Sequence, residues 1–216
     1  FARLVPGQVG EGALPGGLGI QSQGLAGVLA VGDEPLIQDP GREEYSGQTF
    51  GVARYTFPLM NSWGHSVPFV AGKLQKTGRQ AEGIFTSTSF SAEKDVVVLD
   101  MKAAYDIPQL KKLTRTMTYD RKNAVITIQD DVEFTSPQAF GTALVSFADI
   151  RQSATGQFIF KNNNETLHTS ISSTDGPLLF NVTTLKTQIS PKPRRLGIDF
   201  QSPVTRATIT MVFTTK

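Results

Sequence analysis

Residues 113–129 read LTRTMTYDRKNAVITIQ, and this stretch decides the fold class. Two runs rich in β-branched and aromatic residues, Leu113–Tyr119 and Ala124–Gln129, flank the polar segment Asp120–Asn123, which predicts a β-hairpin. In the second run the isoleucines occupy every other position, a pattern typical of a strand with one buried face. The stretch therefore predicts antiparallel β structure.

The same signals recur along the chain. Gln157–Phe160 and Thr166–Ser172 flank the polar segment Asn162–Glu165, which predicts a second hairpin. Further strands are expected at Leu25–Val31, Leu36–Gln38 (after a turn at Gly32–Pro35), Val96–Leu99, Leu178–Thr184 and Thr205–Thr214. Helical patterns are scarce: one or two turns are expected at Asp106–Leu113, where Pro108 disfavours a longer helix. Many short strands with little helix predict an all-β, antiparallel β-sandwich.

A single domain spanning residues 1–216 is expected, because no repeat or linker divides the chain. A chain of this length buries enough surface to form a full hydrophobic core. Residues 1–27 are rich in glycine and predict a loop with one short strand at most. The chain begins at Phe1 without a recognisable signal peptide, so we expect an N-terminus that has been trimmed.

Composition excludes several classes of function. Lys and Arg total 21 against 19 Asp and Glu, and the net charge of +2 is spread along the chain, which argues against a nucleic-acid binder. The densest basic run, Pro191–Arg195, predicts a solvated loop, with a polyanion contact as the alternative. Without cysteine there are no disulfides, thiolate metal sites or cysteine nucleophiles. No apolar run is long enough to cross a membrane as a helix.

Residues 33–83 carry the densest set of unusual side chains. The only Trp, Trp63, and one of the two His residues, His65, lie there. Taken alone, Asp39-Pro40-Gly41 predicts a turn, and a lone His65 fits either a surface loop or a structural histidine. The other histidine, His168, is expected at a solvent-facing position of a strand.

The order of motifs in this segment is more informative than any one of them. The chain presents Asp39-Pro40-Gly41, Tyr45, Arg54-Tyr55, Asn61-Ser62-Trp63-Gly64-His65-Ser66-Val67-Pro68 and Gly72-Lys73-Leu74-Gln75-Lys76-Thr77-Gly78. In this order the motifs resemble the C-terminal β-sandwich domain of the heparinase II/III-like polysaccharide lyases. The remainder of the chain matches that family only as a β-sandwich.

The resemblance implies a function and a partner domain. Lyases of this kind cleave uronic-acid-containing, acidic polysaccharides such as heparan sulfate or alginate by β-elimination, and they pair the sandwich with an N-terminal helical α/α toroid. The chain would then be the C-terminal part of a longer, secreted or periplasmic bacterial protein, and inactive without the toroid. A non-catalytic carbohydrate-binding module and an unrelated structural or adhesion sandwich are the alternatives.

The resemblance also assigns roles to residues. Asp39 and His65 match two ligands of a zinc site, and oxygen and nitrogen donors suit zinc. Tyr45, Tyr55 and His65 are candidates for proton transfer. Arg54, Asn61 and Trp63 are candidates for substrate binding. For both tyrosines, a packed aromatic ring with a satisfied hydroxyl is an equally valid interpretation.

The sequence departs from the family at the remaining zinc ligand. The family has a further histidine upstream of the aspartate, but the corresponding window, Gly19–Leu25, contains neither His nor Asp. Zinc sites normally have at least three protein ligands, so the predicted site is incomplete in this chain. No run of amphipathic helices is available to form a toroid either, and whether this chain is an enzyme stays open.

Overall fold

The computed structural model describes residues 18–23, 26–44, 46–47, 51, 53–78 and 80–215. These residues form antiparallel β-sheets, and helix is confined among them to short 3₁₀ turns: η1 (Arg54–Thr56), η2 (Pro58–Met60), η3 (Ser62–Gly64) and η4 (Lys102–Ala104). The predicted all-β class with little helix is therefore confirmed. No helix in the described part is long and apolar enough to span a membrane.

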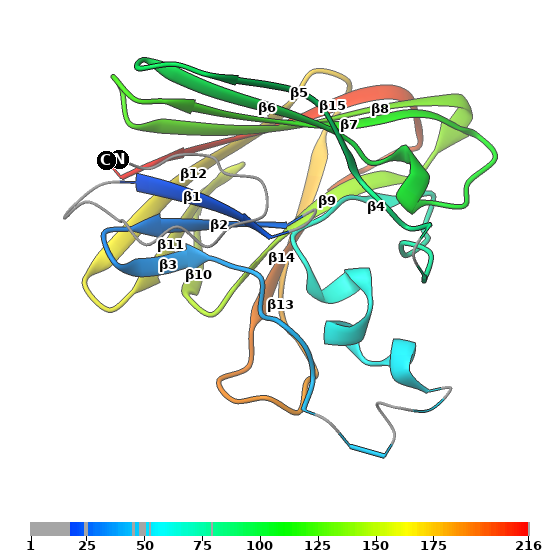
Figure 1. Ribbon diagram of the computed structural model, residues 1–216, viewed down its shortest axis with the longest axis horizontal. Coiled ribbons are helices and arrows are strands. Elements are labelled where there is room, and N and C mark those ends of the chain that lie inside the picture. The colour runs from blue at the N-terminus through cyan, green and yellow to red at the C-terminus, as the bar shows by residue number, and fades with distance from the viewer. Residues whose placement is uncertain are drawn as a thin grey trace.

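An eight-stranded sheet forms the larger layer, in the order β10-β11-β12-β15-β8-β7-β6-β5. Its strands are β5 (Ile84–Phe90), β6 (Lys94–Asp100), β7 (Leu110–Asp120), β8 (Val125–Gln138), β10 (Asp149–Ala154), β11 (Gln157–Asn162), β12 (Glu165–Ser173) and β15 (Val204–Thr214). Both predicted hairpins are present: Asp120 pairs with Val125, and Asn162 pairs with Glu165. Figure 1 shows β5–β8 across the top of the molecule.

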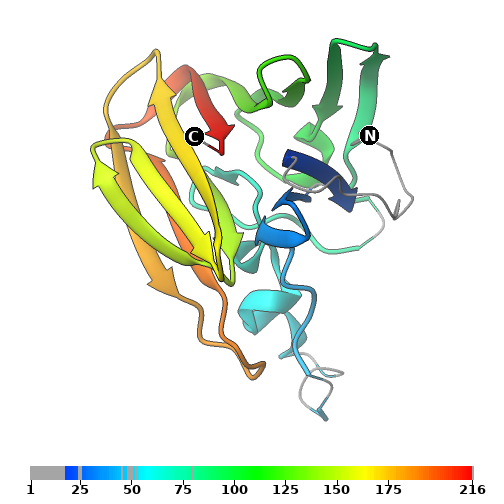
Figure 2. The same cartoon turned by 90° about the vertical axis from the view of Figure 1, so that its left-hand side faces the viewer.

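Two smaller sheets complete the fold. One has the order β13-β14-β9-β4, with β13 (Leu178–Thr184), β14 (Arg194–Phe200), β9 (Phe140–Ser146) and β4 (Phe69–Val70). The other contains β1 (Leu18–Gln23), β2 (Ala26–Val31) and β3 (Glu34–Ile37). Phe158 of β11 packs on Phe180 of β13 with ring centroids 5.2 Å apart. The eight-stranded and four-stranded sheets therefore face each other, as the yellow and orange strands in Figure 2 illustrate.

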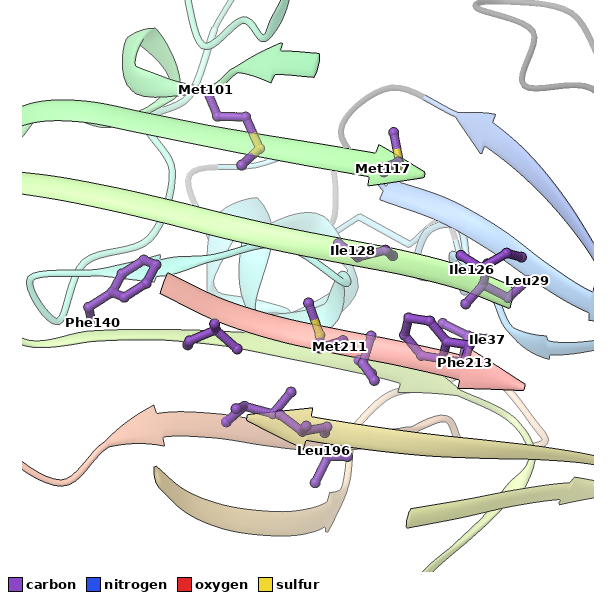
Figure 3. Packing of buried hydrophobic residues seen from close by; sticks show 14 of the residues in the cluster. Leu29, Ile37, Met101, Met117, Ile126, Ile128, Phe140, Leu196, Met211 and Phe213 are labelled. Atoms are coloured by element: carbon purple, nitrogen blue, oxygen red, sulfur yellow. The ribbon is translucent and has the colours of Figure 1, made fainter. Parts of the chain in front are cut away.

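The main core is one cluster of buried hydrophobic residues drawn from all three sheets. Inward positions of β8 alternate with outward ones, as its isoleucines predict. Each fully buried large side chain of this kind contributes about 1.5–3 kcal/mol. Figure 3 shows part of the cluster: Ile126, Ile128, Met211, Phe213, Leu196, Leu29 and Ile37.

A buried ion pair between two neighbouring strands lies at this core. Arg115 of β7 donates from Nε and Nη2 to the two carboxylate oxygens of Asp130 on β8, each at 2.7 Å. The same guanidinium reaches Thr142 Oγ1 of β9 at 3.2 Å and the Ser66 carbonyl at 2.6 Å. The pair therefore links the eight-stranded sheet both to β9 and to the segment that follows His65.

Three expectations need correction. Asp106–Leu113 is not helical: the strand β7 already begins at Leu110, and the nearest helical turn, η4, ends before this segment at Ala104. The predicted loop at Pro191–Arg195 holds for exposed Pro191 and Lys192 but fails at its end, where β14 begins and Arg195 is only 5% exposed. Five strands were not expected: β4, β5, β9, β10 and β14.

The remaining expectations concern the N-terminal segment and His168. The predicted Gly-rich loop at residues 1–27 contains β1 and the start of β2, while residues 1–17 and 24–25 lie outside the described residues. His168 is exposed on β12, as predicted.

Candidate functional site

Asp39 and His65 are brought together although they lie 26 residues apart. His65 Nδ1 and Asp39 Oδ2 form a hydrogen bond of 2.9 Å, with the two side chains 23% and 21% exposed. The other carboxylate oxygen accepts from the Gly41 amide at 2.8 Å, closing the predicted turn. Gly41 has φ +76°, which glycine adopts without a steric penalty.

One residue of β9 fixes both sides of this pair. The Val145 carbonyl accepts from the amide of Gln38, the neighbour of Asp39, at 3.2 Å. The Val145 amide donates to Oγ of Ser66, the neighbour of His65, at 2.8 Å. Arg115 holds the Ser66 carbonyl as well. The site geometry therefore depends on β9, a strand that the sequence did not predict.

The turn before His65 is fixed by its own polar groups. Asn61 Oδ1 caps η3 by accepting from the Trp63 amide at 2.8 Å, and Asn61 Nδ2 donates to the Tyr55 carbonyl at 2.9 Å. Gly64 packs so tightly that a Cβ there would lie 2.5 Å from the Pro58 carbonyl oxygen. Asn61 therefore orders η1 and η3 around the site.

An open hollow of about 420 Å³ lies beside His65. Its described lining includes three cationic residues, Arg42, Arg54 and Lys76, and no Asp or Glu. Tyr55, 48% exposed, also lines it. In Figure 1 the 3₁₀ turns of this region (cyan) lie below β9 and β4. The hollow is large enough for a small ligand, and its charge favours an anionic one.

The predicted site residues divide into three groups. Arg54, Tyr55, Asn61 and His65 line the hollow, and Asp39 reaches it through His65. Trp63 is outside the hollow lining and contacts Phe69 and Arg195 instead. The prediction for Tyr45 falls outside the described residues.

Sequence reasoning missed several contributors. Arg42 follows the turn glycine directly, and Lys76 lies inside the Gly72–Gly78 motif, so their positions were a usable signal. Gln75 joins the hollow to the core: its amide donates to Ser62 Oγ at 2.9 Å, and its side chain donates to the Tyr105 hydroxyl at 3.3 Å. Burial raises the pKa of Tyr105 well above its ordinary value, so this phenol stays neutral.

Opposing influences act on His65. Burial lowers the pKa of its imidazole and is the largest single influence. The hydrogen bond and negative charge of Asp39, together with a backbone hydrogen bond with Leu59, outweigh burial and raise the pKa above 6.5. His65 therefore binds a proton more readily than a free histidine, and the carboxylate of Asp39 balances the charge of its protonated form.

The donor set for the predicted zinc site is incomplete among the described residues. Asp39 and His65 contribute two ligands, and no group of three or more His, Cys, Asp or Glu residues is found in the described part of the chain. A zinc site normally needs three protein ligands. The contact between Asp39 and His65 is a direct hydrogen bond.

Comparisons with known proteins support the fold. No protein family matches the sequence, and no curated protein matches it either. Two heparinase III structures, one with methylated lysines, match with a TM-score of 0.66 at 13% and 12% identity, covering 98% of this chain. Heparan sulfate lyase HepC from Pedobacter heparinus matches with a TM-score of 0.62 at 11% identity, covering 88% of this chain.

These matches define the class of the molecule as a β-sandwich with the fold of a heparinase III β region. The resemblance inferred from the motifs is therefore confirmed at the level of the fold. The chain spans 36%, 37% and 30% of the length of the three matched chains, so it corresponds to about a third of each.

Proposed function

We propose that this chain is the sugar-binding β domain of a lyase that cleaves uronic-acid-containing polysaccharides by β-elimination. In this proposal the complete lyase also contains an N-terminal helical α/α toroid. The observation that carries the proposal is the hollow beside His65, lined by Arg42, Arg54 and Lys76. The names of the matched structures, heparinase III and heparan sulfate lyase, support an acidic polysaccharide as the ligand.

The reaction explains why a cationic hollow is useful. In β-elimination a base removes the C5 proton of the uronate, the electron pair forms a C4–C5 double bond, and the C4–O bond breaks. An acid then protonates the departing oxygen. The uronate carboxylate must be neutralised as negative charge develops, and we assign this to Arg42, Arg54 and Lys76.

Tyr55 is the proposed proton-transfer group of this half of the site. Its side chain is exposed at the hollow, and a positioned Tyr can act as acid or base. His65 is engaged by Asp39 and by the backbone of Leu59, so we assign it a supporting role at the edge of the hollow. Tyr45 stays a candidate from the sequence.

The ligand also suggests a location. Long acidic polysaccharides do not cross membranes, so a protein that binds them acts where they are found. We propose a secreted or periplasmic protein.

Binding is the first test. Uronate oligosaccharides should bind the chain with an affinity that falls as salt screens the charges, whereas a neutral oligosaccharide of equal length should not bind. The triple variant Arg42→Ala, Arg54→Ala, Lys76→Ala should bind about 10- to 100-fold more weakly, because each contact between exposed charges contributes roughly 0.5–1 kcal/mol.

A matched control removes the same charge elsewhere. Lys94→Ala, Arg151→Ala, Lys161→Ala replaces three exposed cations outside the hollow lining and should bind like the wild type. Equal loss in both triple variants, measured by calorimetry, would show that only net charge matters and would overturn the assignment of the hollow.

The non-catalytic module is the second candidate, favoured by the internal partners of His65. An activity assay on a protein that joins this chain to the proposed helical toroid distinguishes the two candidates. A lyase produces the ultraviolet absorbance of an unsaturated uronate, and Tyr55→Phe should then lower kcat with little change in KM. Binding without this product identifies a module.

A further inference from the structure

Arg195 is a buried cation that the proposed chemistry does not use. On β14, Leu196, Ile198 and Phe200 belong to the core, so alternation places Arg195 on the opposite face of the four-stranded sheet. The residue is 5% exposed. Its guanidinium carbon lies 3.8 Å from the centroid of the Trp63 ring, a cation–π contact with the only Trp of the chain.

Two glycines leave room for this arrangement. A Cβ on Gly197 would lie 2.6 Å from Arg195 Nη1, and a Cβ on Gly141 would lie 2.1 Å from Asp199 Oδ1. The side chains of Arg195 and Asp199 therefore lie close over Gly197 of β14 and Gly141 of β9. Burial lowers the pKa of Arg195 while Asp199 raises it, and a guanidinium stays protonated in proteins.

The burial of Arg195 is poorly compensated by hydrogen bonds. Its Nε is buried and has no hydrogen-bond partner among the described residues. Leaving a buried donor unsatisfied costs free energy. The negative charge of Asp199 counters burial only in part, so the pKa of Arg195 stays below its ordinary value, and the Trp63 ring is the close side-chain contact that favours the cation. The arrangement therefore favours Arg195 as an anchor for the ring of Trp63.

Trp63 lies in η3, the turn that ends at His65. The His65 amide donates to the Ser62 carbonyl at 3.3 Å, so η3 and His65 are joined by a backbone hydrogen bond. On the other side of His65, Arg115 and Val145 hold Ser66. His65 thus lies between two anchored neighbours, and Arg195 adds a side-chain contact to the hydrogen bonds of Asn61 and Gln75 that hold η3 on the N-terminal side.

We propose that Arg195 is a positioning residue: by stacking on Trp63 it fixes η3 and thereby presents His65 to Asp39 beside the hollow. The effect on sugar binding rests on the proposed function. The effect on the geometry of His65 does not.

The test compares Arg195→Met with Arg194→Met. The first change removes the stacked cation and keeps a long apolar side chain. Acrylamide should then quench Trp63 fluorescence more strongly, the NMR signal of the His65 Nδ1–H proton should broaden or shift, and the affinity for a uronate oligosaccharide should fall about 2- to 30-fold, the range of a cation–π contact.

Arg194 provides the matched control. It neighbours Arg195 on β14 but pairs with Asp149 at an exposed position, so Arg194→Met should leave all three measurements unchanged. Arg195→Lys, a milder variant in case Arg195→Met does not fold, keeps the charge without the planar stack and should give intermediate values.

Two outcomes overturn the proposal. One is a folded Arg195→Met, or Arg195→Lys where the former does not fold, whose Trp63 and His65 signals match the wild type. The other is an equal effect of Arg194→Met. If the wild type binds no uronate oligosaccharide, the proposed function fails, whereas the fluorescence and NMR signals still decide the role of Arg195.

Discussion

At His65, burial lowers the pKa of the imidazole and hydrogen bonding raises it, and the contacts with Asp39 and Leu59 outweigh burial. Asp39 is close enough to raise the pKa of His65 despite burial. The family resemblance named Asp39 and His65 together as zinc ligands, and the structure joins them by a hydrogen bond. The sequence did not predict that Arg195 is buried. A basic run beside two prolines looks the same in a solvated loop as at the start of a strand.

Asp39→Asn should lower the pKa of His65 below 6.5, because burial remains while the charge of Asp39 is lost. NMR titration of metal-free protein measures this, with the exposed His168 as a second signal in the same sample. An unchanged pKa of His65 would contradict the assigned cause.

The same pair should make stability depend on pH. The pKa of His65 is raised in the folded state, so the contribution of the pair is fully present below the unfolded value of about 6.5. The contribution is lost as the pH rises through the folded value. Denaturant unfolding across this window should show the loss in the wild type and a smaller one in Asp39→Asn.

Gly64→Ala should disturb the site more than the fold. The new Cβ would lie 2.5 Å from the backbone oxygen of Pro58, and such overpacking costs about 1–3 kcal/mol. We expect the Trp63 emission to change and uronate binding to weaken. Gly72→Ala is a useful comparison, because a Cβ there has nothing within 4 Å, although its φ of +68° adds strain. Wild-type emission and binding in Gly64→Ala would contradict the expected displacement of η3.

At the scale of elements, the sequence predicted two hairpins and missed five strands. Two of these, β5 and β10, pair with the adjacent strands β6 and β11, whereas β9 and β14 pair with each other across a long stretch of chain. β7–β8 and β11–β12 pair with adjacent segments across short polar turns, so their signal is local. β9 is buried at every position and shows no alternation. Both β9 and β14 hold residues of the candidate site in place. Because neither strand was predicted, the sequence did not reveal how the site is held.

Arg115→Met should destabilise the protein by about 3–5 kcal/mol, because Asp130 would be left as an unpaired buried charge. The double variant Arg115→Met, Asp130→Leu should recover much of this loss, since apolar replacement of a buried pair is often neutral. Thermal or denaturant unfolding measures both. A double variant less stable than the single one would contradict the view that the unpaired charge dominates.

At the scale of the molecule, the hollow is assembled from three stretches that are separate in sequence: the turn after β3, the η1–η3 region and the segment around Gln75. The motifs predicted that these stretches carry the chemistry. They did not show that Trp63 would face Arg195 instead of the hollow, because this depends on where β14 lies in the folded protein.

Metal content tests the departure from the family pattern. Protein purified without chelators should contain well below one zinc per chain, because Asp39 and His65 offer only two donors. Elemental analysis of the wild type beside Asp39→Ala, His65→Ala measures this. Stoichiometric zinc that disappears in the double variant would mean that a further ligand completes the site.

The attachment of both Gln38 and Ser66 to Val145 has an evolutionary consequence. Both ends of the segment between them are tied to one residue of a buried strand, so insertions or deletions within it need not move the ends. The segment carries Arg42, Arg54 and Tyr55. Natural variants can therefore diversify this segment over a constant framework, as antibodies do with their hypervariable loops. Under the proposed function, such variants would change their ligand preference without rebuilding the sandwich.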